Sequence, residues 1–185
     1  MFKKMSLLVV MFMLILPLTG GEFKGVKMDD SFTVDGKTLL LNGMALRKKY
    51  FFKVYVAGMY LIKKESSAEK ILKADEPRVT IMHFLRSVSA KKINGGWYDG
   101  LKDNTPNHSK ELKSKFDTLA KYMDKMKDGE RIIFTYIPEK GTDVKVKGTS
   151  KGTIKGKDFA DALFACWIGE KPGPGEGFKK GLLGK

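Results

Sequence analysis

The pattern of apolar positions in the first half of the chain predicts antiparallel strands. Two short strand-like runs within residues 31–41 flank Asp35 and Gly36, a pair that favours a type I′ hairpin turn. Residues 50–62 are aromatic and β-branched with a single charge, which predicts a long strand that is buried on both faces over part of its length. Residues 78–86 have the same character and predict a further strand.

Two serines mark the predicted starts of helices in the middle of the chain. Ser66 and Glu69 have the spacing of a capping box, which predicts a short helix over residues 67–74. Ser89 is suited to cap a second helix that runs to about Asp103. The first helix follows the strand predicted at residues 50–62, and the second follows the strand predicted at residues 78–86.

The second half of the chain carries the remaining elements. Residues 108–126 repeat apolar side chains at helical spacing and predict an amphipathic helix whose apolar face is directed toward the core. Residues 157–169 are strongly apolar and predict a buried helix that ends at Gly169, a residue type common at the C′ position. Three strands and a last helical turn complete the pattern, at residues 130–138, 142–148, 151–155 and 176–183.

The order of these elements indicates the fold class. Strands come first, then helices, then strands again and a closing helix, an order typical of an α+β fold with an antiparallel sheet. The chain has 185 residues, which is enough for one domain with a substantial core. No internal repeat and no linker composition divides it.

The N-terminus has the layout of a secretory signal peptide. Lys3 and Lys4 precede an apolar run over residues 7–18, and small residues suited to signal-peptidase cleavage follow. The run is shorter than the roughly 20 residues that a spanning helix needs, so an uncleaved anchor is the less favoured alternative. We therefore predict a signal peptide at residues 1–21, a domain at residues 22–185, and export to the bacterial periplasm.

The predicted export of the chain affects which partner its net positive charge suggests. Lys and Arg number 35 against 21 Asp and Glu, a formal net charge of +14. Such a balance is typical of nucleic-acid binders, but an exported protein does not meet nucleic acid in its compartment. Peripheral contact with an anionic membrane surface is one alternative, and solubility from scattered lysines is the other.

Few residues of this sequence are suited to metal, cofactor or covalent chemistry. One cysteine and two histidines exclude a Cys-rich metal site, and no phosphate-binding glycine loop or nucleophile elbow is present. We therefore expect no metal and no cofactor. Cys166 and His83 are the one nucleophilic pair to weigh, but Cys166 lies on the apolar face of a predicted helix, where a thiol behaves as a small hydrophobe.

Aromatic residues are concentrated in two places, residues 50–60 and Trp97 with Tyr98, and Arg47 is close to the first of them in sequence. An apolar pocket with a few polar groups is the usual form of a small-molecule site. The same aromatic residues are equally suited to fill a core, so the pattern alone leaves both interpretations open.

Four motifs resemble the chalcone isomerase family. They are residues 41–47 (LNGMALR), 51–61 (FFKVYVAGMYL), 165–170 (ACWIGE) and 178–184 (FKKGLLG). Their order and spacing match over nearly the whole chain after the signal peptide, and they are most similar to exported bacterial chalcone-isomerase-like proteins. The resemblance implies an open-faced β-sandwich, in which a large antiparallel sheet is covered on one face by a layer of helices.

The resemblance also implies a site between the sheet and the helices. In the catalytic members of the family an arginine stabilises developing negative charge, and that position matches Arg47. Where those enzymes carry a threonine, a tyrosine, a lysine, an asparagine and a second hydroxyl, this chain carries in the same order Tyr55, Trp97, Gly100, Asn104 and Cys166. Only the arginine and the asparagine are retained, so we expect a ligand-binding site made of Arg47, Tyr55, Trp97, Asn104 and Cys166.

Three functions are compatible with these residues. The favoured one is a non-catalytic binding protein for a small apolar or amphiphilic ligand such as a fatty acid, with the headgroup held by Arg47. The second is an isomerase or intramolecular lyase acting on an enone-like substrate, with Arg47 as electrophilic stabiliser and Tyr55 as acid. The third is a ligand-free interaction module in which Trp97 and Tyr55 fill the pocket.

Overall fold

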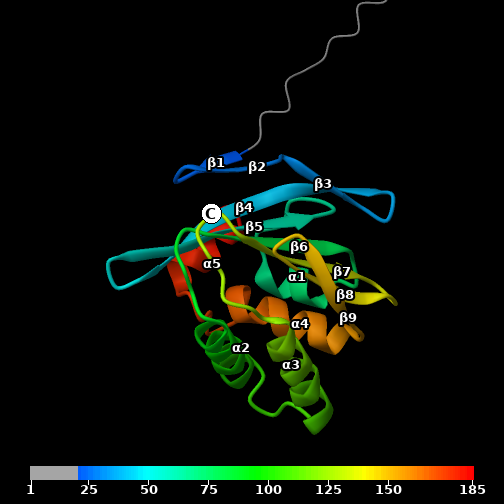
Figure 1. Ribbon diagram of the computed structural model, residues 1–185. Helices are drawn as coiled ribbons and strands as arrows, with labels where there is room; N and C mark the ends of the chain where they lie inside the picture. The colour runs from blue at the N-terminus through cyan, green and yellow to red at the C-terminus, as the bar shows by residue number, and fades with distance from the viewer. Residues whose placement is uncertain (1–20) are drawn as a thin grey trace, which may run out of the picture.

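A seven-stranded antiparallel sheet with five helices forms the body of the protein (Figure 1). The structure is a computed structural model that describes residues 21–185, so the predicted signal peptide lies, apart from Gly21, outside the described residues. The strands are β1 (Gly21–Phe23), β2 (Val26–Met28), β3 (Ser31–Val34), β4 (Lys37–Lys49), β5 (Phe52–Leu61), β6 (Arg78–Phe84), β7 (Arg131–Ile137), β8 (Gly141–Val146) and β9 (Thr149–Ile154). The helices are α1 (Ala68–Lys73), α2 (Ala90–Asn104), α3 (Lys110–Tyr122), α4 (Lys157–Ile168) and α5 (Glu176–Leu182).

The sheet runs from β3 to β9 in chain order, and every pair of neighbouring strands is antiparallel. Helices α2, α3 and α4 lie on one side of this curled sheet, whereas the separate β1–β2 hairpin lies on the other (Figure 1). The predicted α+β class and open-faced β-sandwich are confirmed. The β1–β2 hairpin is an addition that the hydrophobic pattern did not predict, because its strands have only three residues each.

Strand β5 is buried on both faces, as predicted, because its alternate side chains enter two different apolar clusters. Tyr55 and Ala57 face the helices, and Val56 and Tyr60 face the β1–β2 hairpin, where they pack with Met28. The small hairpin therefore accounts for the near-continuous apolar sequence of this strand.

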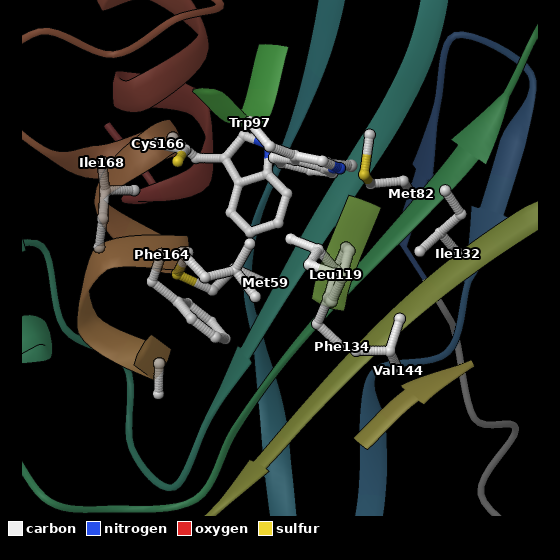
Figure 2. Packing of buried hydrophobic residues seen from close by; sticks show 14 of the residues in the cluster. Met59, Met82, Trp97, Leu119, Ile132, Phe134, Val144, Phe164, Cys166 and Ile168 are labelled. Atoms are coloured by element: carbon white, nitrogen blue, oxygen red, sulfur yellow. The ribbon is translucent and has the colours of Figure 1, made fainter. Parts of the chain in front are cut away.

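Helix α4 is the centre of the larger cluster. Nine of its residues are buried, so it is apolar almost all round and packs against the sheet and against the other helices. Figure 2 shows Phe164 and Cys166 of this helix among side chains from the sheet. The rings of Trp97 from α2, Trp167 from α4 and Phe134 from β7 lie with centroids 5.3–5.6 Å apart, which joins the outer helix to the sheet.

The predicted helix starts are correct in one case and shifted in the other. Ser89 caps α2 by accepting a hydrogen bond from the backbone N–H of Lys92. At α1 the cap is Ser67 and not Ser66, so the capping-box prediction is wrong. Glu69 forms an ion pair with Lys73 at 2.6 Å in place of the predicted backward hydrogen bond.

Two predicted boundaries also differ from the structure. The strand predicted over residues 50–62 begins two residues later, because Tyr50 and Phe51 form the turn between β4 and β5. The helix predicted over residues 108–126 ends at Tyr122, and Met123 is already extended with ψ 144°. In both cases apolar residues continue past the end of the element, so periodicity alone overruns the boundary.

Candidate functional site

A pocket of about 630 Å³ lies between the helix-facing side of the sheet and helices α2 and α4. Its walls come from the adjoining ends of β4 and β5, from the end of β6 and the loop that follows, and from the loop after α4. The apolar lining consists of Val54, Met82, Phe84, Val88, Ile93, Trp97 and Trp167. The volume and the mainly apolar lining are typical of a small-molecule site.

Arg47 and Tyr55 lie side by side on one wall of this pocket. They are opposite partners in the β4–β5 register and therefore project from the same face of the sheet. A register shift follows Arg47 immediately, so the strand is irregular at the pocket. In the described part of the chain, no carboxylate or carbonyl oxygen pairs with the Arg47 guanidinium, which leaves its donors for a ligand.

The Tyr55 hydroxyl is held by the helix layer. Trp167 Nε1 donates a hydrogen bond to Tyr55 Oη at 3.3 Å, and the rings of Phe84 and Phe178 each lie 5.7 Å from the Tyr55 ring. Burial raises the pKa of Tyr55 to about 12, although the Trp167 hydrogen bond and the positive charge of Arg47 act in the opposite direction. Tyr55 is therefore a neutral hydroxyl at physiological pH, able to donate a hydrogen bond.

Trp97 supplies a further donor at the pocket wall. Its side chain is buried, yet among the described residues its Nε1 has no hydrogen-bond partner. A buried indole N–H without a partner costs free energy, so this donor is a natural contact for an acceptor atom of a ligand. Trp97 therefore lines the pocket rather than filling it.

Cys166 touches the pocket but has no nucleophilic character. Its thiol donates to Ala162 O at 3.3 Å, and burial raises its pKa to about 12, so it stays protonated at physiological pH. The pairing with His83, which the sequence already disfavoured, is not formed in the structure. His83 belongs to the opposite face of β6 from Met82 and lies outside the pocket, where its Nδ1 accepts from Arg131 Nε at 3.1 Å.

Gly100 on α2 lies directly against Cys166 on α4. A Cβ added at Gly100 would lie 2.5 Å from Cys166 Sγ, so the glycine allows α2 to approach α4 closely. This is the position at which the resemblance places a lysine in the catalytic enzymes. In this protein the space that a lysine side chain would need at residue 100 is occupied by Cys166 of α4.

Asn104 is the predicted site residue that the structure does not bring to the pocket. Its Nδ2 donates to Gly100 O and Lys171 O, and its Oδ1 accepts from the backbone N–H of Lys171 at 2.9 Å. The amide therefore ties the end of α2 to the loop after α4. Gly169 has an extended backbone, not a left-handed C′ conformation, and a Cβ there would lie 2.3 Å from Asn104 Oδ1.

The mouth of the pocket carries charges that the sequence did not point out. Lys49, Arg86 and Lys92 are exposed lining residues, and Asp99 is the one acid in the lining. The Arg86 guanidinium lies over the Phe52 ring, 4.3 Å from its centroid. Arg86 and Lys92 are distant in sequence from Arg47, so only the fold brings these cations together.

The donors at the pocket wall, Arg47, Tyr55 and Trp97, can bind an anionic group or stabilise developing negative charge. Across residues 21–185, no group of His, Cys, Asp and Glu is arranged to hold a metal ion. The open space beside Arg47 also argues against the interpretation in which Trp97 and Tyr55 fill the pocket. Within the same residues no helix is both long and apolar enough to cross a membrane.

Fold and pocket together define a two-layer chalcone-isomerase type of protein, with a ligand-sized space between sheet and helices. The model of the chalcone isomerase-like family matches residues 20–184, and the chain belongs to this family. No curated protein matches the sequence.

The crystal structure of a fatty-acid binding protein from Arabidopsis thaliana is similar in fold, with a TM-score of 0.68 at 18% sequence identity. The match covers 92% of this chain and 95% of that chain. At this identity the likeness concerns the fold, and the nature of a ligand has to be argued from the pocket itself.

Proposed function

We propose that the protein binds an amphiphile with an anionic headgroup, such as a fatty acid, without transforming it. The observation that carries the proposal is the Arg47 guanidinium, which has no partner among the described residues and lies at the wall of a largely apolar pocket. A carboxylate pairs with a guanidinium through two parallel hydrogen bonds, while an acyl chain is suited to the aromatic and aliphatic lining. The fatty-acid binding function of the Arabidopsis neighbour supports this choice of ligand class.

Further donors favour an anionic headgroup over a neutral one. The Tyr55 hydroxyl lies beside Arg47, and the buried Trp97 N–H lacks an acceptor among the described residues. The cations at the mouth, Lys49, Arg86 and Lys92, outnumber the single acid there and would attract an anion from solution.

The alternative function is an isomerase or intramolecular lyase in which Arg47 stabilises an enolate and Tyr55 acts as acid. A neutral Tyr55 beside Arg47 is the observation in its favour. Against it stand Trp97, Gly100 and Cys166, which supply neither the hydroxyls nor the lysine of the catalytic enzymes. Turnover of chalcones or related enones that disappears in Arg47→Ala would establish this alternative and overturn the non-catalytic proposal.

We also propose that binding takes place outside the cytoplasm, in the bacterial periplasm, on the basis of the signal-peptide pattern at residues 1–21. N-terminal sequencing of the protein recovered from a periplasmic fraction tests this directly. A chain that begins at about residue 22 is expected, and a full-length chain retained in the cytoplasm would contradict it.

The ligand proposal is tested by titrating the protein with dodecanoate and with its methyl ester. Dodecanoate should bind and the ester should bind more weakly, because the ester lacks the charge that pairs with Arg47. Loss of a charge-assisted, bidentate contact in Arg47→Gln should weaken dodecanoate binding about 10- to 100-fold. Native mass spectrometry of the protein purified from cells should show a co-purified acyl ligand that is lost from this variant.

Arg131→Gln is the matched control, because Arg131 is an exposed arginine outside the pocket. This variant loses the same charge and should keep the affinity of the unmodified protein. Equal weakening by both substitutions, or no binding of dodecanoate to the folded protein, would refute the proposal.

A further inference from the structure

The turn between β4 and β5 presents the most exposed aromatic residues in the described chain. Tyr50 is 84% exposed, Phe51 99% and Phe52 58%, and this hairpin extends away from the body of the molecule (Figure 1). Folded proteins rarely place three consecutive aromatic side chains in water without a partner for them. No side chain within residues 21–185 covers Phe51.

The backbone of this turn is also poorly suited to its residues. Tyr50 has a positive φ of 55°, a conformation that favours glycine or asparagine. The three other two-residue hairpin turns also begin with a non-glycine residue of positive φ, but there that residue is polar and a glycine follows it: Lys24-Gly25, Asp35-Gly36 and Lys147-Gly148. The aromatic residues at this one turn therefore contribute neither to the turn nor to the core, which points to a role outside the fold.

Basic residues surround the aromatic tip. Lys48, Lys49 and Lys53 are exposed and directly flank the three aromatics, and no acid occurs between residues 48 and 53. A fourth cation, Arg86, lies over the ring of Phe52. We call the segment at residues 48–53 together with Arg86 the basic aromatic tip.

We propose that the basic aromatic tip is a docking site for an anionic lipid bilayer, with Phe51 inserted at the level of the headgroups. Aromatic side chains favour the membrane interface, and lysines next to them are attracted to negatively charged headgroups. Charge complementarity selects a bilayer over an apolar protein groove, because exposed lysines flank the aromatic residues on both sides of a hairpin that projects from the molecule.

The tip and the pocket share residues. Lys49, Tyr50 and Phe52 belong to the tip and also line the pocket, so docking would bring the mouth of the pocket to the membrane surface. This part rests on the proposed function, since it gives a bound amphiphile a short path between bilayer and pocket. The docking itself requires no ligand.

Flotation of the full chain with vesicles tests the proposal. Vesicles of phosphatidylglycerol and phosphatidylcholine should carry the protein, and pure phosphatidylcholine vesicles should carry less. In the double variant Tyr50→Asn/Phe51→Gly, the asparagine suits the positive φ of residue 50 and the glycine replaces a fully exposed side chain, so the variant should fold as well as the parent. Its binding to the anionic vesicles should fall about tenfold or more, because it has lost the inserting side chains.

Matched variants distinguish vesicle binding by the tip from non-specific binding by other exposed apolar or basic residues. Leu40→Ser removes an exposed apolar side chain from β4 outside the tip, and it should not change vesicle binding. Lys48→Glu/Lys49→Glu should weaken binding strongly, whereas the exposed pair changed in Lys63→Glu/Lys64→Glu should have a smaller effect. The N-terminal segment is the same in every variant, so the differences report on the tip.

Two results would overturn the proposal. One is equal flotation of the double variant and the parent, which would place any membrane contact elsewhere. The other is no flotation of the parent with anionic vesicles, as expected if the tip docks on a protein. Solution titration with dodecanoate keeps the two proposals apart. The single variant Phe51→Gly changes a residue outside the pocket lining, so it should keep its affinity for dodecanoate although it binds vesicles more weakly.

Discussion

Two glycines of this protein are required by the side chains that pack against them. Gly100 leaves room for Cys166, and Gly169 leaves room for Asn104. The resemblance places a lysine at Gly100 and a hydroxyl at Cys166 in the catalytic enzymes. These two differences are not independent, because the two residues contact each other where α2 packs on α4.

The reactivity of Cys166 tests this account of the residue scale. Because burial raises the thiol pKa to about 12, the native protein should react slowly with a disulfide reagent at mildly alkaline pH. Addition of denaturant should make the reaction fast and stoichiometric, as followed by absorbance. Rapid labelling of the native protein would show that the thiol is accessible and would contradict the described packing.

His83 predicts a pH dependence of stability. Burial, and secondarily the charge of Arg131, lowers the pKa of His83 in the folded state. The unfolded chain then binds a proton more readily than the folded one, so stability is fully present above the unfolded pKa of about 6.5 and declines as the pH falls below it.

This decline should be visible as a lower denaturation midpoint in urea at mildly acidic pH than at neutral pH. In His83→Gln the difference between the two conditions should shrink, because the titrating group is gone. An unchanged difference in the variant would assign the pH dependence to other groups.

At the scale of elements, two close approaches position the layers around the pocket. Helix α2 reaches α4 at Gly100, and α5 reaches β4 at Gly43, where an added Cβ would lie 2.2 Å from Gly181 O. Next to it, Asn42 donates to Leu182 O at 2.8 Å and to Glu65 O at 3.0 Å. The Asn-Gly pair of the family motif is therefore explained by helix docking and not by contact with a ligand.

Substitutions on one helix measure the importance of the α2–α4 approach. Gly100→Ala should destabilise the protein by about 1–3 kcal/mol, because its Cβ would overlap with Cys166. Gly95→Ala on the same helix meets no atom within 4 Å and should stabilise the protein by about 0.5–1 kcal/mol. Urea denaturation of both variants provides the comparison, and equal effects of the two substitutions would contradict the close approach.

At the scale of the whole molecule, the layered fold was predictable and the exact composition of the site was not. Apolar patterning, turn residues and capping serines located every strand of the large sheet and all five helices. The strand predicted to end at residue 41 continues to Lys49, where the alternation is less regular. The order of the elements and the family motifs then gave the open-faced sandwich. The β1–β2 hairpin and the turn at Tyr50 were missed, because short strands and exposed aromatics give misleading local signals.

The candidate site residues came from the family resemblance, and their placement together was predictable where one strand register holds them. Arg47 and Tyr55 occupy one wall of the pocket together, and Trp97 faces them from α2. Asn104 lies on the same helix one turn beyond Gly100, past the end of the pocket, where it binds the chain after α4. The cations of the mouth needed the structure, because three separate segments contribute them.

The measurement that tests the central claim most directly is the ionisation of a bound fatty acid. Dodecanoate labelled with ¹³C at its carboxyl carbon reports its protonation state by NMR while it is bound to the protein. If the headgroup pairs with Arg47, the bound carboxyl should titrate at a lower pH than the same ligand bound to Arg47→Gln. Identical titration of the ligand in the parent and in Arg47→Gln would contradict the assignment of Arg47 as the headgroup site.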